Sequence, residues 1–430
     1  IDLPVGKRRV GYLDIAKAFF VMGWTAFGGP AAHIAVFQQV FVEAREWLSV
    51  GVFTEFLALG QCIPGPTSTQ MAFAMGIVKK GVPGGLLSGS MFLHPGLVMM
   101  TAIGAVSGGA LTAPSAPVEA LVAGLTAVAI ALVAAAAVGL GKKICVDRAT
   151  ALICAASTAV TVYYQAAWVL PLTMLVGGVI TAVIYRKRAH TDANPEDHAS
   201  IGSLGLGLRG GAVLLAVWVG LLVTLVAVAQ VVGTGLWAPL QWFESFFKAG
   251  SLIFGGGQVL LPLLLDDMTT ERCTQGGACQ AWMTEAQFFA GLAVAQAMPG
   301  PLFNFSAYLG SIIAHNAGFN SVFGALVCWV ALFSPGIMLI FSVLPFWGWF
   351  RRFPLYKRAL PGINAAAVGL IVAAVFRMAF KGRAGSPFPD ASVSIAVIGF
   401  AAVTQARVPA PAAVVGGGLL GLVAWATKMT

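Results

Sequence analysis

Two proline-glycine-proline tripeptides interrupt apolar stretches of the chain, and their spacing suggests chemistry. Gln61 precedes Pro64-Gly65-Pro66, and Gln296 precedes Pro299-Gly300-Pro301 at the same spacing. Proline fits the first turn of a helix, because its missing N–H would be unpaired there anyway. The other unpaired N–H groups of a helix start carry partial positive charge and attract anions. The two tripeptides therefore predict two anion-binding helix starts.

A second type of break occurs earlier in each part of the chain. Phe27-Gly28-Gly29-Pro30 recurs as Phe254-Gly255-Gly256-Gly257. Glycine allows a ligand to approach the backbone closely. We expect helices over residues 31–44 and 67–78 after the two breaks of the first part. A single break is more often a kink or a close helix contact, but two types that both recur favour a substrate path.

The predicted anion site consists of the four breaks and the polar side chains beside them. Its members are Gly28, Gly29, Pro30, His33, Arg45, Gln61, Pro64, Gly65, Pro66, Thr67, Ser68, Gln70, Gly255, Gly256, Gly257, Gln296, Pro299, Gly300, Pro301 and Asn304. Neutral donors such as Asn304 suit an anion that must also leave, and the planar guanidinium of Arg45 suits an oxyanion.

Ionisable residues inside a membrane are functional candidates by default. His33, Glu55 and His94 are the candidates for proton or ion coupling, and further charged candidates are Lys17, Asp266, Asp267 and Arg377. For each of them, a helix-end or snorkelling role remains the alternative.

The composition determines the elements that position these residues. Of 430 residues, 58% are hydrophobic and 10% are charged, whereas soluble domains carry about 25% charged residues. A helix needs about 20 apolar residues to cross a bilayer. Apolar runs of about that length recur at Val118–Leu140, Gly211–Val232, Val322–Leu344 and Pro361–Phe380. We expect an all-α polytopic membrane protein, and no removable signal peptide follows the basic N-terminal residues.

The chain contains two related parts. Besides the four breaks, the landmarks Trp47, Pro95-Gly96, Gly124 and Pro171 recur in the same order as Trp282, Pro335-Gly336, Gly362 and Pro411. We interpret residues 1–188 as a first transporter repeat, 189–209 as a polar linker, 210–234 as an extra transmembrane helix and 235–430 as a second repeat.

An odd number of spans between the repeats inverts the second one. Lys79 and Lys80 follow the first Pro-Gly-Pro, whereas the loop around His315 carries no Lys or Arg and the next loop holds Arg351 and Arg352. Positive loops are typically cytoplasmic, so this exchange indicates inverted topology. Lys381 and Arg383 do not fit the scheme. We expect about thirteen membrane segments of about 20 residues, with the segments at the breaks either broken crossings or re-entrant hairpins.

Other functional classes find no support in the sequence. The chain has no HExxH, GxSxG or P-loop lysine, so we expect no enzyme, no cofactor and no direct use of ATP. The six cysteines form no metal-ligand spacing, so no metal site is expected. A disulfide between Cys273 and Cys279 requires that their loop face an oxidising compartment. The net charge of +9 does not accompany a basic run with interleaved aromatics, so nucleic acid is not an expected partner.

The motifs together resemble the chromate ion transporter (CHR) family in its long, two-domain form. The resemblance rests on Phe27-Gly-Gly-Pro-Ala-Ala-His33, on Phe41-Val-Glu-Ala-Arg45-Glu-Trp47-Leu48 and on Gln61-x-x-Pro64-Gly65-Pro66, and it extends over essentially the whole chain. It implies export of chromate across a bacterial inner membrane and chromate resistance, with sulfate as a chemically similar competitor.

We therefore expect a secondary, multi-pass inner-membrane transporter that exports chromate bound at half-helix N-termini near the midplane. The expected partners are chromate or a sulfate-like oxyanion and membrane lipid, and a homodimer remains open. The alternatives are a sulfate or other oxyanion transporter, an anion channel and a non-transporting membrane sensor. The second repeat has Gly257 for Pro30 and Leu260 for His33, so we expect the first repeat to contribute more to substrate handling.

Overall fold

The computed structural model describes residues 10–26, 29–110, 115–164, 169–187, 205–233, 237–253, 260–273, 279–347 and 354–427 of the chain. The described part is helical except for a ribbon of two short strands. Before the linker, the elements are α1 (Tyr12–Thr25), α2 (Gly29–Phe37), the π-helix η1 (Gln38–Ala44), α3 (Val50–Cys62), α4 (Thr67–Ala110), α5 (Ala116–Ile144), α6 (Arg148–Tyr163), α7 (Val169–Ile184) and the 3-10 turn η2 (Tyr185–Lys187).

After the linker the chain continues with the single long helix α8 (Gly207–Val232). The remaining elements are α9 (Ala238–Leu252), α10 (Leu260–Thr269), β1 (Arg272–Cys273), β2 (Cys279–Gln280), α11 (Glu285–Ala297), the 3-10 turn η7 (Leu302–Asn304), α12 (Phe305–Asn316), α13 (Ser321–Val343), the 3-10 turn η8 (Leu344–Phe346), α15 (Pro354–Ala384), α16 (Pro389–Thr404) and α17 (Ala410–Ala426). Strands β1 and β2 pair antiparallel, with the backbone of Cys273 opposite Cys279.

The helices of the two parts follow the same order and have similar lengths. Helices α3 and α11 have 13 residues each, and both begin at a hydroxyl N-cap, Ser49 or Thr284, that accepts a backbone N–H. Such a cap satisfies one of the donors that a helix start leaves unpaired. Helices α6 and α16 have 16 residues each. In the described chain α8 lies between α7 and α9 and has no equivalent in the first part.

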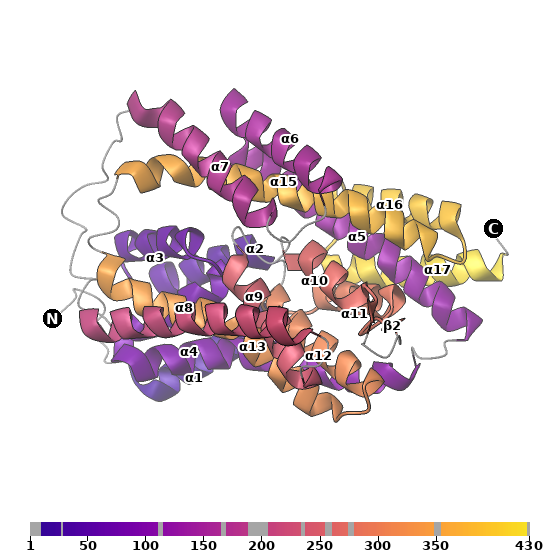
Figure 1. The fold of residues 1–430 in the computed structure, drawn as a ribbon, viewed down its shortest axis with the longest axis horizontal. Helices are drawn as coiled ribbons and strands as arrows, with labels where there is room; N and C mark the ends of the chain where they lie inside the picture. Colours follow the sequence, from indigo (N-terminus) through magenta and orange to yellow (C-terminus); the bar gives the residue numbers. More distant parts are fainter. Residues whose placement is uncertain are drawn as a thin grey trace.

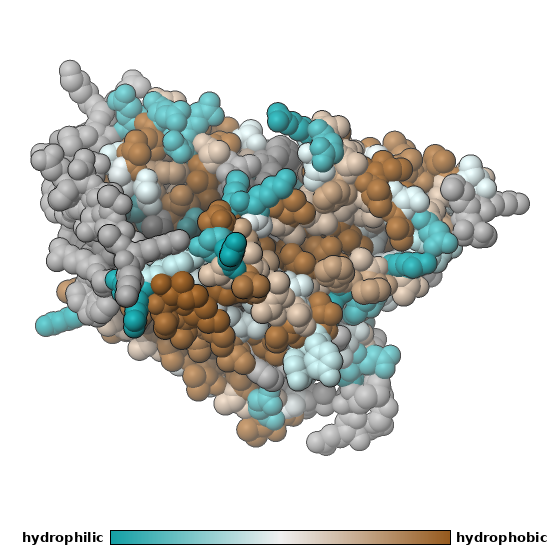
Figure 2. Space-filling model, turned by 90° about the horizontal axis from the view of Figure 1, so that it is seen from above, coloured by the Kyte–Doolittle hydropathy of each residue, from teal (hydrophilic) through white to brown (hydrophobic). Residues whose placement is uncertain are grey.

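Five helices of the described chain are long and apolar enough to cross a membrane: Thr67–Gly108, Ala116–Ile144, Gly207–Val232, Ser321–Phe346 and Arg358–Ala384. All four apolar runs of the sequence are confirmed as helices. None of the apolar window of α8 is buried, and large hydrophobic areas with a few hydrophilic patches cover the face in Figure 2. An exposed helix that is apolar on every side is expected to face lipid.

Two helical bundles make up most of the described fold (Figure 1). Bundle A contains α1, α4, α8, α9, α12 and α13, and bundle B contains α5, α6, α7, α15, α16 and α17. Each bundle takes equivalent helices from both parts of the chain. In bundle A, the contact of α1 with α4 is equivalent to that of α9 with α13. In bundle B, the contact of α5 with α17 is equivalent to that of α15 with α7. The two parts are therefore interleaved.

Glycines allow the closest helix contacts of bundle B. A Cβ atom on Gly124 of α5 would lie 2.1 Å from the carbonyl oxygen of Gly417 in α17. A Cβ atom on Gly362 of α15 would likewise lie 1.9 Å from the carbonyl oxygen of Gly177 in α7. Small residues let the backbones of apolar helices approach, which gives van der Waals contact that does not depend on water. The same device thus closes both equivalent helix pairs.

The helices that link the bundles pack unequally. Helix α11 lies against α5 and α17 of bundle B, and α10 lies between α9 and α15. Helix α3, the counterpart of α11, packs mainly against α4 of bundle A. The contact between the bundles is therefore more extensive on the side of α10 and α11.

Candidate functional site

Each proline-glycine-proline break is held by the other part of the chain. The N–H of Gly65 donates to the carbonyl oxygen of Ile253 at 2.8 Å, and the N–H of Gly300 donates to that of Ala26, also at 2.8 Å. Ile253 and Ala26 end the stretches that lead into Phe254 and Phe27, the first residues of the other two breaks. Each Pro-Gly-Pro break is thus bonded to the residue that precedes a glycine break of the other part of the chain.

The structure confirms the helices that the breaks predict. Helix α2 begins at Gly29, and the helical stretch with η1 ends at Ala44, the predicted end. Helix α4 begins at Thr67, and a backbone kink at Lys80 and Gly81 interrupts it close to the predicted end of its first segment. Gly28, Gly255, Gly256 and Gly257 lie outside the described residues.

Glycine is required in both tripeptides by backbone conformation. Gly65 has a φ of 121° and Gly300 a φ of 90°, a region that side-chain-bearing residues rarely adopt. A Cβ atom on Gly65 would also lie 2.7 Å from Nε2 of Gln70 and 2.9 Å from Cα of Gly336. The first break is therefore both strained for any other residue and closely packed.

The polar side chains after Pro66 are buried and mostly bonded. Thr67 Oγ1 donates to the carbonyl oxygen of Gly60 at 2.9 Å, and Gln70 Nε2 donates to that of Pro64 at 2.7 Å. Ser68 Oγ lies 3.2 Å from Nδ1 of His33. These contacts hold the break in shape, because buried polar groups that lose their partners cost free energy.

His33 is fully buried and joins α2 to α4. Its Nε2 lies 3.0 Å from the carbonyl oxygen of Ala26, and its ring packs edge-on against Phe92. A carbonyl oxygen only accepts, so Nε2 carries the proton of this bond, and in the neutral ring Nδ1 accepts from Ser68. The geometry gives His33 a structural bond at the break in addition to the coupling role that the sequence suggests.

Replacing His33 by alanine should lower the stability of the protein and slow transport. The change leaves Ser68 and the Ala26 carbonyl without this partner, which costs about 1–3 kcal/mol for a buried polar group. Thermal unfolding of the purified protein measures the loss. His94→Ala is the matched control, because His94 is exposed on α4 and surface changes stay within about 0.5 kcal/mol. Equal melting temperatures of the two variants would contradict the assignment.

The second tripeptide carries a different set of side chains. Asn304 is buried, and its Oδ1 accepts from Nε1 of Trp329 at 2.8 Å. Within the described residues, Asn304 Nδ2 and Gln296 Nε2 are buried donors without a hydrogen-bond partner. Pro299, Gly300 and Pro301 are buried as well. This break therefore has unused donors in a region that excludes water.

Three of the other predicted site residues lie at the surface of the described chain. Arg45, Gln61 and His94 are exposed, and the guanidinium of Arg45 lies over the ring of Trp47 at 5.3 Å. Glu55 is half-buried on α3. Successive helix residues point in different directions, so closeness in sequence to a break did not bring these side chains into the buried cluster.

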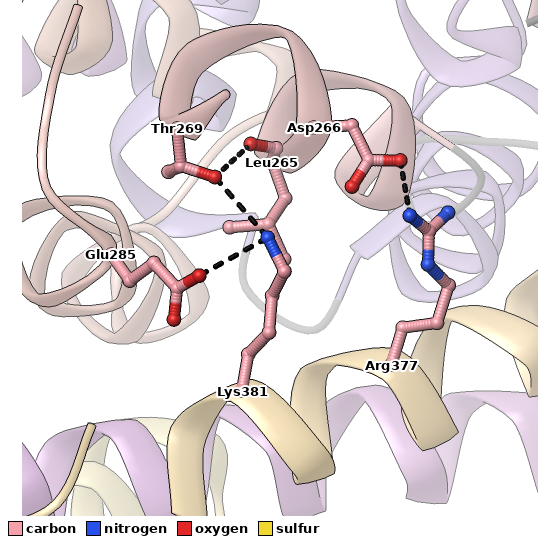
Figure 3. A network of polar contacts seen from close by, with 6 residues as sticks. All are labelled: Leu265, Asp266, Thr269, Glu285, Arg377 and Lys381. Carbon is pink, nitrogen blue, oxygen red and sulfur yellow. Dashed lines mark hydrogen bonds and ion pairs between the residues drawn. The ribbon is translucent and has the colours of Figure 1, made fainter. Parts of the chain in front are cut away.

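An ion-pair network between the linking helices and bundle B is a feature that the motifs did not indicate (Figure 3). Arg377 of α15 pairs with Asp266 of α10. One turn further along α15, Lys381 Nζ lies 3.1 Å from Oε1 of Glu285 and 3.3 Å from Oγ1 of Thr269. The sequence analysis named Asp266 and Arg377 only as separate charged residues. Lys381 did not fit the loop-charge rule, and this misfit was the sequence signal for its place in the network.

The end of α10 is also attached to bundle A. Asp267 accepts from Ser245 Oγ at 2.7 Å and lies 3.8 Å from Nζ of Lys248, both on α9. The two consecutive aspartates therefore connect α10 to both bundles. When the repeats are aligned on their shared landmarks, Asp266 and Arg377 correspond to Gln39 and Gly139, so this bridge belongs to the second part of the chain alone.

A cavity lies beside the network, between α11 and bundle B. It has a volume of about 350 Å³ and is lined by residues of α5, α11 and α15, among them Glu119, Glu285 and Lys381. The ion pair of Lys381 and Glu285 thus borders open, partly polar space. Helix α11 is therefore not closely packed against bundle B at this place.

Comparisons with known proteins agree with the membrane character of the fold. The family model described as "Chromate transporter" matches residues 13–182 and 240–422. The "Chromate transport protein" of Pseudomonas aeruginosa is 28% identical over 91% of this chain and 87% of its own length. That of Cupriavidus metallidurans is 28% identical over 96% and 93%, and the "Probable chromate transport protein" of Synechococcus elongatus is 26% identical over 84% and 83%. No solved structure matches the chain significantly.

Proposed function

Because the chain belongs to the chromate transporter family, we propose that it is a secondary transporter that exports chromate across the inner membrane and confers chromate resistance. The chromate binds at the helix starts after the four breaks. The reciprocal docking of Gly65 on Ile253 and of Gly300 on Ala26 supports this site most directly. It gathers the starts of helices from both parts of the chain, where backbone N–H groups and helix dipoles attract an oxyanion.

The same proposal includes two inverted repeats with about thirteen membrane segments. The equivalent order of the helices, the reciprocal hydrogen bonds and the interleaved bundles support the repeats. Helix α8 supports the inversion, because one additional crossing between repeats that each have an even number of spans reverses the second repeat. The exchange of positive charge between equivalent loops points the same way.

Alternating access then follows from movement of bundle A against bundle B. Bundle A and the linking helices carry the breaks, and the present contacts are extensive at α11 but not at its counterpart α3. In an inverted repeat, exchange of these two arrangements opens the opposite side of the membrane. We assign the structure to one end state, closed along α10 and α11.

The test is chromate flux in liposomes that contain the purified protein, with the pH gradient and the sulfate concentration varied. We expect radiolabelled chromate to accumulate against its gradient when a proton gradient is imposed, and sulfate to compete. A well-folded protein that moves no chromate under any gradient contradicts the proposal.

The same assay separates the alternatives. An anion channel dissipates a chromate gradient but never builds one, and a sulfate transporter shows the higher kcat/KM for sulfate. A sensor gives no flux, and its deletion leaves the chromate content of cells unchanged.

A further inference from the structure

The unpaired polar atoms beside the two proline-glycine-proline breaks differ in kind. Next to Pro299–Pro301, both are amide donors, Gln296 Nε2 and Asn304 Nδ2. Next to Pro64–Pro66, they are the hydroxyl of Thr69, which can donate or accept, and Oε1 of Gln70, which only accepts. All four atoms are buried and have no hydrogen-bond partner among the described residues. The second break therefore offers two amide donors, whereas the first offers one hydroxyl and one acceptor.

The orientation of the Asn304 amide is fixed by its neighbours. Its Oδ1 accepts from Nε1 of Trp329, and an indole N–H can only donate. If the amide were flipped, its NH2 group would point at that N–H, and no hydrogen bond could form. A Cβ atom on Gly96 would lie 2.0 Å from Nδ2, which shows that the amide nitrogen lies directly against the backbone of α4. Asn304 itself is 3% exposed and precedes α12. Its free N–H groups are thus held at a helix start.

Gln70 lies against its own break in a comparable way but with the opposite polarity. Its Nε2 donates to Pro64 and approaches the carbonyl oxygen of Gly336 at 3.4 Å. Gly65 and Gly336 surround this amide, as Gly300 and Gly96 lie beside that of Asn304. Because the donors of Gln70 face protein carbonyls, only its acceptor oxygen remains, and an acceptor does not stabilise an anion.

We propose that the break of the second repeat, flanked by Gln296 and Asn304, is the principal oxyanion subsite. This rests on the proposed function and reverses the expectation that the first repeat contributes more. Two amide donors and the start of the helical stretch η7–α12 meet a tetrahedral oxyanion with N–H groups that no other described group uses. Trp329 is a positioning residue, since its N–H binds Oδ1 of the amide and thereby fixes the place of the free NH2 group.

The decisive variants exchange donors for acceptors at constant shape. Asn304→Asp keeps the oxygen that accepts from Trp329 and replaces the free NH2 by a negatively charged oxygen. Gln296→Glu likewise replaces the free NH2 of the side chain that precedes the break by a negatively charged oxygen. We expect each to raise the KM for chromate at least tenfold in the liposome assay. Asn304→Ala removes the donor without adding charge, so it serves if the charged variant does not fold.

The matched controls are the equivalent positions of the first repeat. Gln61 stands three residues before its tripeptide, as Gln296 does, and Thr69 stands three residues after it, as Asn304 does. We expect Gln61→Glu, at an exposed side chain, to leave the KM for chromate within twofold, and Thr69→Val to raise it less than Asn304→Ala does. Trp329→Phe should raise KM with little change in kcat, whereas a merely structural role would lower the amount of folded protein and leave KM unchanged.

The outcomes separate this inference from the proposed function. If the folded wild-type protein carries no chromate, the proposed function fails. If it carries chromate and the variants at Asn304 and Gln296 keep the wild-type KM, or only those at Gln61 and Thr69 raise it, the subsite is wrong while the function stands.

Discussion

Replacing Gly65 by alanine should reduce chromate transport by about 100-fold, because small displacements of a binding element can have effects of that size. With its φ of 121°, an alanine at this position stores roughly 1–3 kcal/mol of strain. The new Cβ atom would also meet Gln70 and the backbone of Gly336 at 2.7 and 2.9 Å, and overpacking of this kind costs about 1–3 kcal/mol.

The break relieves this strain only by moving away from Ile253, whose carbonyl oxygen accepts from the Gly65 N–H. Transport and thermal unfolding of the same preparation measure the two consequences separately. Gly300→Ala should have the smaller effect, since its φ of 90° is also unfavourable but its nearest neighbour lies at 3.5 Å.

Two further glycines serve as controls. Gly81 also has a positive φ, but a Cβ atom there meets nothing within 4 Å, and Gly139 lies in α5 with equally open surroundings. We expect Gly139→Ala to be silent and Gly81→Ala to show strain without loss of the site. A Gly65→Ala protein that transports chromate at the wild-type rate would contradict the conclusion that close packing of this break is needed for transport.

Replacing Arg377 by glutamine should produce the second large effect. The variant leaves Asp266 without its cation near the boundary of the bundles, and the side chains of the pair are 14% and 32% exposed. Removal of one partner from a fully buried ion pair lowers the free energy of unfolding by about 3–5 kcal/mol, and removal from an exposed pair lowers it by up to about 1 kcal/mol. For this partly buried pair we expect roughly 1–3 kcal/mol and a transport rate lowered at least tenfold.

The transport defect has a specific cause. Arg377 with Asp266 and Lys381 with Glu285 are the ion pairs of the described chain that connect α10 and α11 to bundle B. Under the proposed alternating access, their loss weakens the end state to which we assign the structure and shifts the balance between the two states. Exchange of the charges, Asp266→Arg with Arg377→Asp, should restore part of the rate.

Arg383→Gln is the matched control on the same helix. Arg383 pairs with Asp390 inside bundle B, and the two side chains are 59% and 80% exposed. We expect its transport rate to equal that of the wild type. If Arg377→Gln and Arg383→Gln behave alike, the pair with Asp266 has no part in transport.

The membrane class and the positions of the helix breaks could be predicted from the sequence, because both are local properties. A run of apolar residues gives a helix wherever it packs, and the proline and glycine signals at Gly29 and Thr67 start helices through backbone geometry alone. The repeated landmarks also predicted the common order of the helices in both parts, and the family resemblance was confirmed by the match over residues 13–182 and 240–422.

The candidate site was predicted less completely. Arg45, Gln61 and His94 stood close to breaks in the sequence but are exposed, whereas Trp329, which binds Asn304, was not among the predicted site residues. Polar side chains in a helix follow its 3.6-residue turn, and an apolar helix gives little sign of which face meets a neighbour.

The sequence by itself determined what kind of molecule this is and where its chain breaks. Only the tertiary structure decided what the breaks meet: Gly65 binds Ile253, Gly300 binds Ala26, and Arg377 binds Asp266. These partners are far apart in the chain, and their meeting depends on how α1, α9 and α15 pack. It also decided which amide keeps a free donor, because Trp329 and Gly96 reach Asn304 only through the folded bundle.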